Sequence, residues 1–271
     1  MGTQRAPATG DGVSIEALAA PSPSSSSDRG RIDSLVLLAL LLIAWQILFQ
    51  IVGDVAMSSP MRTLDKMVSM LRDASFWPNV WKTMAPFLIA LVLEIAIGVV
   101  AGALLGIHRL SGDAFGPLLV GIYSIPKVLF YPVIILTFGI ATTSEVVFAF
   151  IHGVFPIILF TMNAVRSLKP VYAKTARSLR LSLVQRVWHV AIPAVLPEIF
   201  SGFRIAFAMS LLGVLLCEMF GSKNGLGFLL VGAIGANRVD ETMALAVMIA
   251  AFAVFTNFGL LWVDHKLHQR F

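Results

Sequence analysis

The chain has 271 residues, of which 58% are hydrophobic and 13% are charged. Average soluble domains are roughly 45–50% apolar and about 25% charged, so this composition excludes an ordinary water-soluble globular protein. Several uncharged runs approach the ~20 residues that a helix needs to cross a bilayer, which predicts an all-α polytopic membrane protein. The formal charge of +5 is then expected to reflect membrane topology rather than nucleic-acid binding.

The first segment is polar and of low complexity. Residues 1–31 are rich in Ala, Ser, Pro and Gly, with the run PSPSSSS at 21–27. Such a segment buries too little apolar surface to offset the entropy of ordering, so we predict a disordered cytoplasmic tail. A first span follows between Asp33 and Asp54, and with its external connection it forms the predicted segment 32–75.

Five further apolar segments complete a predicted set of six spans. They lie at about 83–107, 115–138, 146–165, 202–220 and 242–263. The segment 115–138, which is the third span along the chain, is interrupted by Pro126, Lys127 and Pro132, which predicts a broken or flexible span. The mixed segment 54–82 before the second span carries the aromatic FWP cluster at 76–78, which is typical of a membrane interface.

The charges predict the orientation of these spans. Six spans place both termini on one side, and that side then holds 13 of the 20 Lys and Arg residues against 6 on the opposite side. The positive-inside rule therefore places both termini and the basic segment 166–204 in the cytoplasm.

That basic segment predicts an amphipathic helix. Apolar residues recur in steps of three or four, at Tyr172, Ala176, Leu179, Leu183 and Val187, so they share one helical face. The pattern suits either a helix on the inner leaflet or a helix that docks on a partner. The prolines at 193 and 197 are expected to stop the helix and to fix the direction in which the chain leaves it.

The spacing in this segment resembles a known loop. Inner-membrane permease subunits of binding-protein-dependent ABC importers carry Glu-Ala-Ala, three residues, Gly, nine residues and Ile-x-Leu-Pro. The same frame here holds Lys174-Thr175-Ala176, then Arg180, then VAIP at 190–193. Lys174 replaces the acidic residue and Arg180 replaces the glycine. Arg180 is therefore expected either to be strained or to enforce a more regular helix.

Other short motifs resemble the nitrate, sulfonate and taurine branch of these permeases. They are SIP at 124–126, YP at 131–132, FGI at 138–140, LPEI at 196–199, SGFR at 201–204, EMFG at 218–221 and GLG at 225–227. The resemblance covers roughly residues 76–267, which it identifies as a type 1 permease domain, and leaves the tail and the first span outside.

The resemblance implies that loop 167–197 forms a coupling helix seated in a separate ATPase subunit. The residues that it assigns to this contact are Tyr172, Lys174, Thr175, Ala176, Leu179, Arg180, Leu183, Ile192, Pro193 and Pro197. Lys174 would then face a compensating acidic residue on the ATPase or would weaken coupling. The chain has no Gly-x-x-x-x-Gly-Lys-Ser/Thr loop, so ATP is expected on the partner and no cofactor on this chain.

Charged and kinked positions inside the spans are candidates for the translocation path. Glu218 is the first choice for lining or gating it, with Met219 beside it, and a structural ion pair is the alternative. Lys127 and Pro132 in the broken span are the other candidates, although Lys127 is also explained by structural pairing or by snorkelling to the interface. GLG at 225–227 is expected to form a re-entrant loop near the outer docking face or a plain turn.

We find no catalytic motif and no metal site, since His265 and His268 lie at an exposed helix end without a pre-organised ligand set.

We expect a subunit of the bacterial inner membrane that works as a dimer, with cytoplasmic ATPase subunits, an external solute-binding protein and surrounding lipid. It would import a small, anionic solute. A permease-like scaffold or sensor that no longer couples to an ATPase is the alternative. The transported solute and the choice between homodimer and heterodimer are left open by the sequence.

Overall fold

The computed structural model describes residues 26–270, and every element in this range is helical. The all-helical fold class that the composition predicts is therefore confirmed. The chain divides into two compact units, Met1–Ile51 and Val52–Phe271, and each is described here by itself.

The first unit contains α1 (Ser26–Val52). Its large apolar side chains are exposed, as in a helix that is surrounded by lipid. The apolar part, Val36–Val52, has 17 residues and is about 26 Å long, which is near the lower limit for a span. Residues 26–31 are helical although we predicted disorder through residue 31, because a helix nucleated by an apolar run extends at little cost. The rest of the predicted tail, 1–25, lies outside the described residues.

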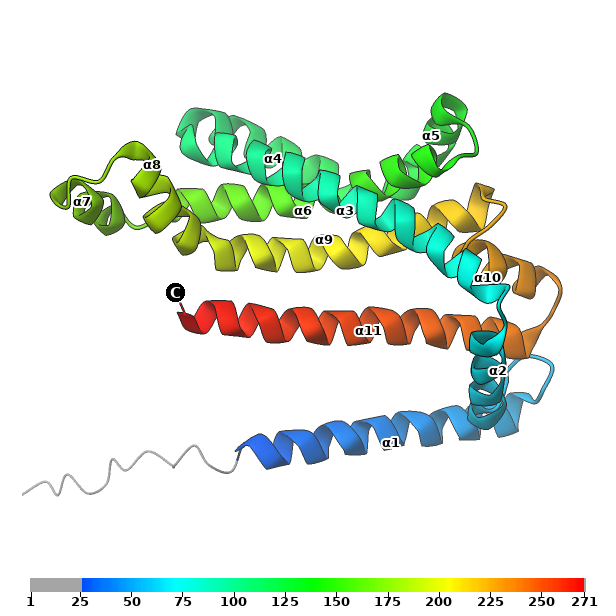
Figure 1. The fold of residues 1–271 in the computed structure, drawn as a ribbon. Coiled ribbons are helices and arrows are strands. Elements are labelled where there is room, and N and C mark those ends of the chain that lie inside the picture. The colour runs from blue at the N-terminus through cyan, green and yellow to red at the C-terminus, as the bar shows by residue number, and fades with distance from the viewer. Residues whose placement is uncertain (1–25, 271) are drawn as a thin grey trace, which may run out of the picture. The chain divides into compact units, whose positions relative to one another are not determined.

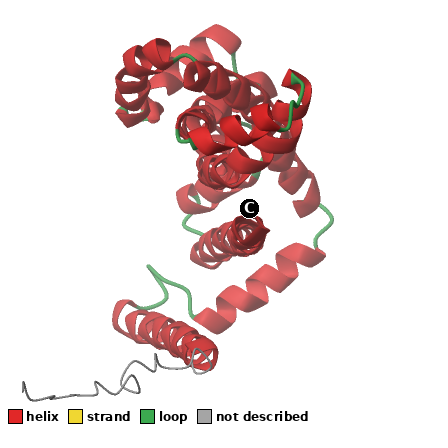
Figure 2. Ribbon diagram, turned by 90° about the vertical axis from the view of Figure 1, so that its left-hand side faces the viewer, coloured by secondary structure: helices red, strands yellow, loops and turns green. Residues whose placement is uncertain are grey.

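The second unit starts with a helix that runs crosswise. Figures 1 and 2 show α2 (Pro60–Arg72) at a steep angle to the long helices. Its first turn is fixed by Ser59, whose Oγ accepts a hydrogen bond from the Arg62 N–H at 3.3 Å. In the turn that follows α2, Asp73 accepts a hydrogen bond from the Ser75 N–H at 2.9 Å, and the bonds from Ser75 hold the pKa of Asp73 below its usual value.

Four long apolar helices follow, and they match four of the predicted spans. They are α3 (Phe76–Ile107), α6 (Thr142–Arg166), α9 (Ile192–Gly221) and α11 (Val239–Arg270). Each begins several residues before its apolar run, because polar and aromatic residues of the membrane interface continue the helix.

The third predicted span is broken. It consists of α4 (Arg109–Ser124), a 3-10 turn (Lys127–Phe130) and α5 (Tyr131–Phe138), and the two halves bend by 84°. Pro126 stands at the bend, where it cannot donate the backbone hydrogen bond that would continue α4. The long helices and this broken pair account for five spans, so the predicted sixth depends on α1 and stays a prediction.

The central bundle is formed by α3, α6 and α9, which lie side by side in Figure 1. Gly98, Gly102 and Gly106 form one face of α3 against α6, and a Cβ at any of them would overlap atoms of α6. The every-fourth glycine pattern is therefore a close helix contact within the subunit. Phe87 and Phe148 are buried almost completely in the same bundle.

A second layer joins α2, α11 and α10 (Leu226–Gly235). Met70, Ala233 and Leu245 are buried in its apolar cluster, and Phe76 at the start of α3 packs there as well. At the other end of α11, Arg204 and Asp264 form an ion pair at 3.0 Å that ties α11 to α9.

The GLG segment at 225–227, which we predicted as a re-entrant loop or a turn, forms the N-terminus of the ten-residue helix α10.

Segment 166–204 differs from the single amphipathic helix that we predicted. It contains α7 (Pro170–Ser178), a break, α8 (Leu183–Arg186) and a π-helical turn (Val187–Ala191) that runs directly into α9. The prolines at 193 and 197 lie within α9, so they do not end the helix as we predicted. The wider π turn just before Pro193 accommodates a residue that lacks a backbone N–H.

Candidate coupling and gating sites

The break between α7 and α8 is organised around Arg180. Its φ is 52°, in the left-handed region that favours glycine. The Leu181 N–H donates to the Ala176 carbonyl at 3.0 Å, as in a helix end closed by a left-handed residue. Arg180 therefore takes the conformation that a glycine would take at this point, which is the strained alternative of the two that we considered.

The second short helix has a capping box. The Gln185 N–H donates to Ser182 Oγ at 3.3 Å, and the Ser182 N–H donates to Gln185 Oε1 at 2.9 Å. Arg186 Nε donates to the Leu181 carbonyl at 3.1 Å and fixes the break from the other side. The Ser-x-x-Gln spacing is a sequence signal for a new helix start that our prediction of one continuous helix overlooked.

An apolar groove of about 500 Å³ lies between α7 and the start of α9. Four of the predicted coupling residues line it, namely Tyr172, Ala176, Leu179 and Pro193. Ala176 is buried, whereas Leu179 remains 66% exposed. The structure therefore brings these four together and leaves one large apolar side chain at the surface.

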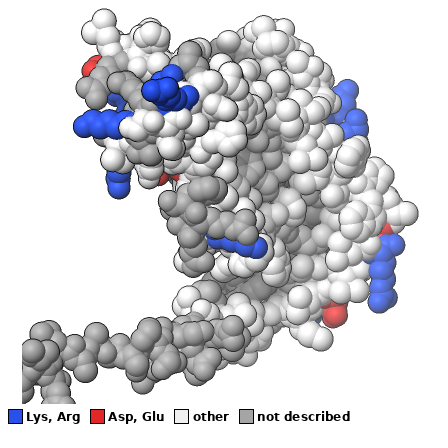
Figure 3. Space-filling model, turned by 60° about the vertical axis from the view of Figure 1, so that its left-hand side comes forward, with Lys and Arg blue, Asp and Glu red and all other residues white. Residues whose placement is uncertain are grey.

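The other predicted coupling residues do not line this groove. Ile192 is half-buried and Pro197 is buried in the first turns of α9, while Lys174 is exposed on α7. The side chains of Thr175 and Leu183 lie outside the described residues. Figure 3 shows Lys and Arg side chains gathered at this end of the molecule, where Lys169, Lys174 and Arg180 are exposed.

At the opposite end of α9, Glu218 is almost completely buried and holds the start of α10. Its Oε2 accepts hydrogen bonds from the Gly227 N–H at 2.8 Å and from Thr83 Oγ1 at 3.0 Å. Thr83 Oγ1 in turn accepts from the Leu226 N–H at 2.9 Å, and Asn79 Oδ1 accepts from the Gly225 N–H at 3.0 Å. We call these six residues the α10 clamp.

The clamp leaves no room for larger residues in the loop. A Cβ at Gly225 or Gly227 would overlap the Glu218 side chain, and Gly225 has a φ of 107°. Sequence reasoning found Glu218 and the glycines but missed Asn79 and Thr83, whose spacing of four residues places both on one face of α3. Met219, beside the clamp, is half-buried.

Lys127 lies at the bend of the broken span. Its Nζ donates to the Tyr123 carbonyl at 3.0 Å and lies 4.4 Å from the centre of the Tyr123 ring. Pro132 is in the first turn of α5. Tyr131 connects this bend to α9, because its ring centre lies 5.5 Å from that of Phe220. Among residues 26–270, Lys127 and Glu218 form no ion pair with each other.

Glu94 is an acidic side chain inside the central bundle. It is fully buried, and a Cβ at Gly153 of α6 would overlap its carboxyl group. The Ser210 hydroxyl of α9 faces the same carboxyl, although none of these three oxygens reaches hydrogen-bonding geometry within the described residues. No recorded ion pair includes Glu94, so the bundle holds a carboxyl group without a cation.

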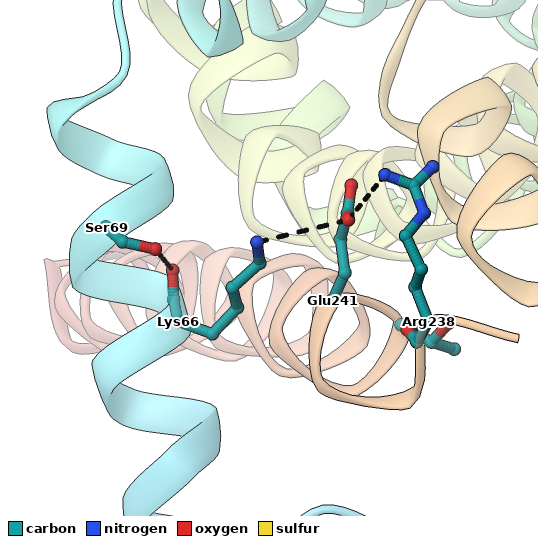
Figure 4. Close-up of polar contacts among 5 residues, drawn as sticks. Lys66, Ser69, Arg238 and Glu241 are labelled. Carbon is teal, nitrogen blue, oxygen red and sulfur yellow. Dashed lines mark hydrogen bonds and ion pairs between the residues drawn. The ribbon is translucent and has the colours of Figure 1, made fainter. Parts of the chain in front are cut away.

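A polar contact joins α2 to the start of α11. Figure 4 shows Lys66 and Arg238 pointing toward Glu241, whose Oε2 lies 4.0 Å from Lys66 Nζ and 2.8 Å from Arg238 Nη1. Glu241 is largely buried and borders an open polar pocket of about 380 Å³. Among residues 26–270 the structure shows no cluster of three metal-ligating side chains.

Comparisons with known proteins agree with this architecture. Residues 94–271 match the family described as the inner membrane component of binding-protein-dependent transport systems. The chain belongs to this family. It is therefore a multi-pass membrane subunit of a transport system, and the resemblance seen in the sequence is confirmed.

Three characterised relatives span most of the chain. The taurine transport system permease protein of Escherichia coli is 24% identical over 237 residues, which cover 85% of this chain and 86% of that protein. The nitrate import permease protein of Synechococcus elongatus is 24% identical over 229 residues, covering 81% of each. The bicarbonate transport system permease protein of the same species is 29% identical over 188 residues, covering 68% of each.

Proposed function

We propose that this chain is the permease half of an ATP-driven importer for a small anionic solute, with α7 and α8 as its ATPase-docking segment. The observation that carries this proposal is the continuous helix from Val184 to Gly221. Its 38 residues extend about 57 Å, from the cytoplasmic groove at one end to the α10 clamp at the other. A displacement at the inner end is therefore passed to the outer end without an intervening loop.

The proposed docking surface combines one exposed apolar side chain with basic neighbours. Leu179 projects at the break, and Lys174 and Arg180 lie exposed beside it. Buried apolar anchors surrounded by charge are typical of protein interfaces. We propose that the ATPase offers an apolar pocket for Leu179 and acidic groups for Lys174 and Arg180.

The substrate proposal combines the relatives with the chain's own charge. The relatives are named for taurine, nitrate and bicarbonate, all of which carry an anionic group. Lys127 supplies a positive charge at membrane depth, at the bend of a broken span, where transporters often place their binding sites. We propose that Lys127 and Pro132 border the path and that Glu218 and Met219 set the position of its outer gate through α10.

The remaining assembly follows from topology. The positive-inside rule places both termini and the docking segment in the cytoplasm. Two copies, or one copy with a similar chain, would enclose the path. The face around Lys66, Arg238 and Glu241 would receive the solute-binding protein, and the permease domain would occupy 76–267.

The docking proposal is tested by Leu179→Asp. We expect this variant to lose co-purification with the ATPase subunit, because a charge replaces the apolar anchor. Leu110→Asp is the matched control, since Leu110 is 86% exposed at the same end of the bundle but lies outside the groove. Equal recovery of the ATPase with both variants would contradict the proposal.

The orientation is tested by cysteine labelling. Cys217 is buried and is replaced by alanine to give a background without cysteine. A Lys174→Cys probe in that background should react with an impermeant maleimide only after the cells are opened. Labelling from outside intact cells would place α7 on the wrong side of the membrane for an ATPase.

A further inference from the structure

The second unit contains an apolar cavity that the transport proposal does not use. It has a volume of about 310 Å³ and lies between the start of α3 and the helices α9, α10 and α11, with one contribution from α2. All of its lining side chains are apolar, among them Leu71, Val80, Met84, Leu215, Leu245 and Phe252. An anion has no partner there, so the cavity is unsuited to the transported solute.

The cavity has a buried floor and an open rim. Leu245 and Leu211 in the floor are 0% and 4% exposed, whereas Trp77 and Phe252 at the rim are 53% and 37% exposed. Water gains no hydrogen-bond partners in such a space, and an unfilled apolar void forfeits packing contacts. An apolar group that enters from the surrounding membrane satisfies both conditions.

The length and depth of the cavity suit the part of one lipid chain that lies nearest the interface. Its wall on α3 runs from Phe76 to Met84, about 12 Å along the helix axis. It begins where α2 and the Trp77 indole mark the interface, so it ends less than halfway through a hydrocarbon core of about 30 Å. The Trp77 indole N–H donates to the Leu71 carbonyl at 3.1 Å, which holds the rim in place.

A basic residue stands at the mouth. Arg72 follows the lining residue Leu71 and is exposed in the last turn of α2. A guanidinium group at the interface pairs well with a phosphate. We propose that this cavity binds one acyl chain of a phospholipid from the outer leaflet and that Arg72 contacts its phosphate.

The proposal is tested by filling the cavity. The full-length chain is reconstituted into vesicles of phosphatidylglycerol and phosphatidylethanolamine, extracted in mild detergent and examined by native mass spectrometry. We expect one retained phospholipid per chain, and at least tenfold less retention with Met84→Trp. Val80→Trp fills the same space from another position, in case the first variant folds poorly.

The matched control is Met61→Trp, because Met61 is 68% exposed on α2 and does not line the cavity. It should retain the lipid as the unaltered chain does. Arg72→Glu should reduce the retention of phosphatidylglycerol more than fivefold relative to phosphatidylethanolamine. Equal retention in the filled variants, binding of detergent alone, or closure of the cavity by a second copy of the chain in cross-linking would overturn the proposal.

Discussion

Arg180 illustrates how one backbone angle shapes the segment between α7 and α9. A non-glycine residue in the left-handed region costs roughly 1–2 kcal/mol, because its Cβ approaches the following carbonyl oxygen. Arg180 is held there by the Leu181 hydrogen bond to Ala176 and by the capping box that starts α8. The exposed guanidinium group is thereby presented at the surface proposed for docking.

Arg180→Gly should stabilise the break by about 1 kcal/mol, because glycine adopts the same angle without the Cβ clash. Hydrogen exchange of the Leu181 amide measures this, and it should slow roughly fivefold at that free-energy change. Arg180→Ala removes the charge and keeps the Cβ, so it should give no such protection. Identical effects of the two substitutions would mean that charge, and not backbone strain, governs the break.

Glu218 stabilises the folded protein through two hydrogen bonds in a buried site. Glu218→Ala should lower the free energy of unfolding by about 1–3 kcal/mol, because the Gly227 N–H and the Thr83 hydroxyl lose a buried acceptor. Glu218→Gln keeps an acceptor oxygen and should recover part of the loss. Thermal unfolding in detergent measures both, with Glu198→Ala as the control at an exposed position of the same helix. Equal loss with alanine and glutamine would argue against the hydrogen bonds.

At the scale of helices, the close contact of α3 with α6 depends on residues without side chains. Gly102→Ala should destabilise the bundle by about 1–3 kcal/mol, because the new Cβ overlaps the backbone of Ile158. Gly121→Ala is the matched control, since nothing lies near its Cβ position in α4. Chemical unfolding should separate the two variants, and a neutral Gly102→Ala would show that α6 moves aside at low cost.

The apolar pattern predicted most of these helices because a bilayer imposes a minimum length on each span. The broken span was foreseen from its prolines. The break at Arg180 was not foreseen, because arginine gives no sign of a left-handed angle. The α10 clamp was found only in part, since its contacts join α3 to residues 135 to 146 positions later and leave no local pattern.

At the scale of the molecule, α11 is attached to the bundle at its two ends. α10 and α2 hold it near its N-terminal end, and the pair of Arg204 with Asp264 holds it near its C-terminal end. Both side chains of this pair are mostly buried, so the loss of one partner leaves an uncompensated charge.

Asp264→Arg should therefore release the inner end of α11 and lower the free energy of unfolding by about 3–5 kcal/mol at most, the range measured for broken buried pairs. The double variant Arg204→Asp with Asp264→Arg restores opposite charges and should recover much of the stability. A double-mutant cycle by thermal unfolding gives the coupling. Absence of recovery would mean that the surroundings of Asp264, including the Ser201 hydroxyl, favour its carboxylate specifically.

The buried carboxyl of Glu94 constrains how the chain is made. Glu94 leaves the ribosome 59 residues ahead of Gly153, the residue that makes space for it. At 5–20 residues per second, roughly 3–12 seconds pass between the two. During that interval α3 carries an acidic group with an insertion cost of about 2.5–3.5 kcal/mol and no protein pocket to receive it. The many apolar residues of α3 offset this cost, so α3 can enter the lipid alone, and Glu94 gains its protein pocket only when α6 packs against α3.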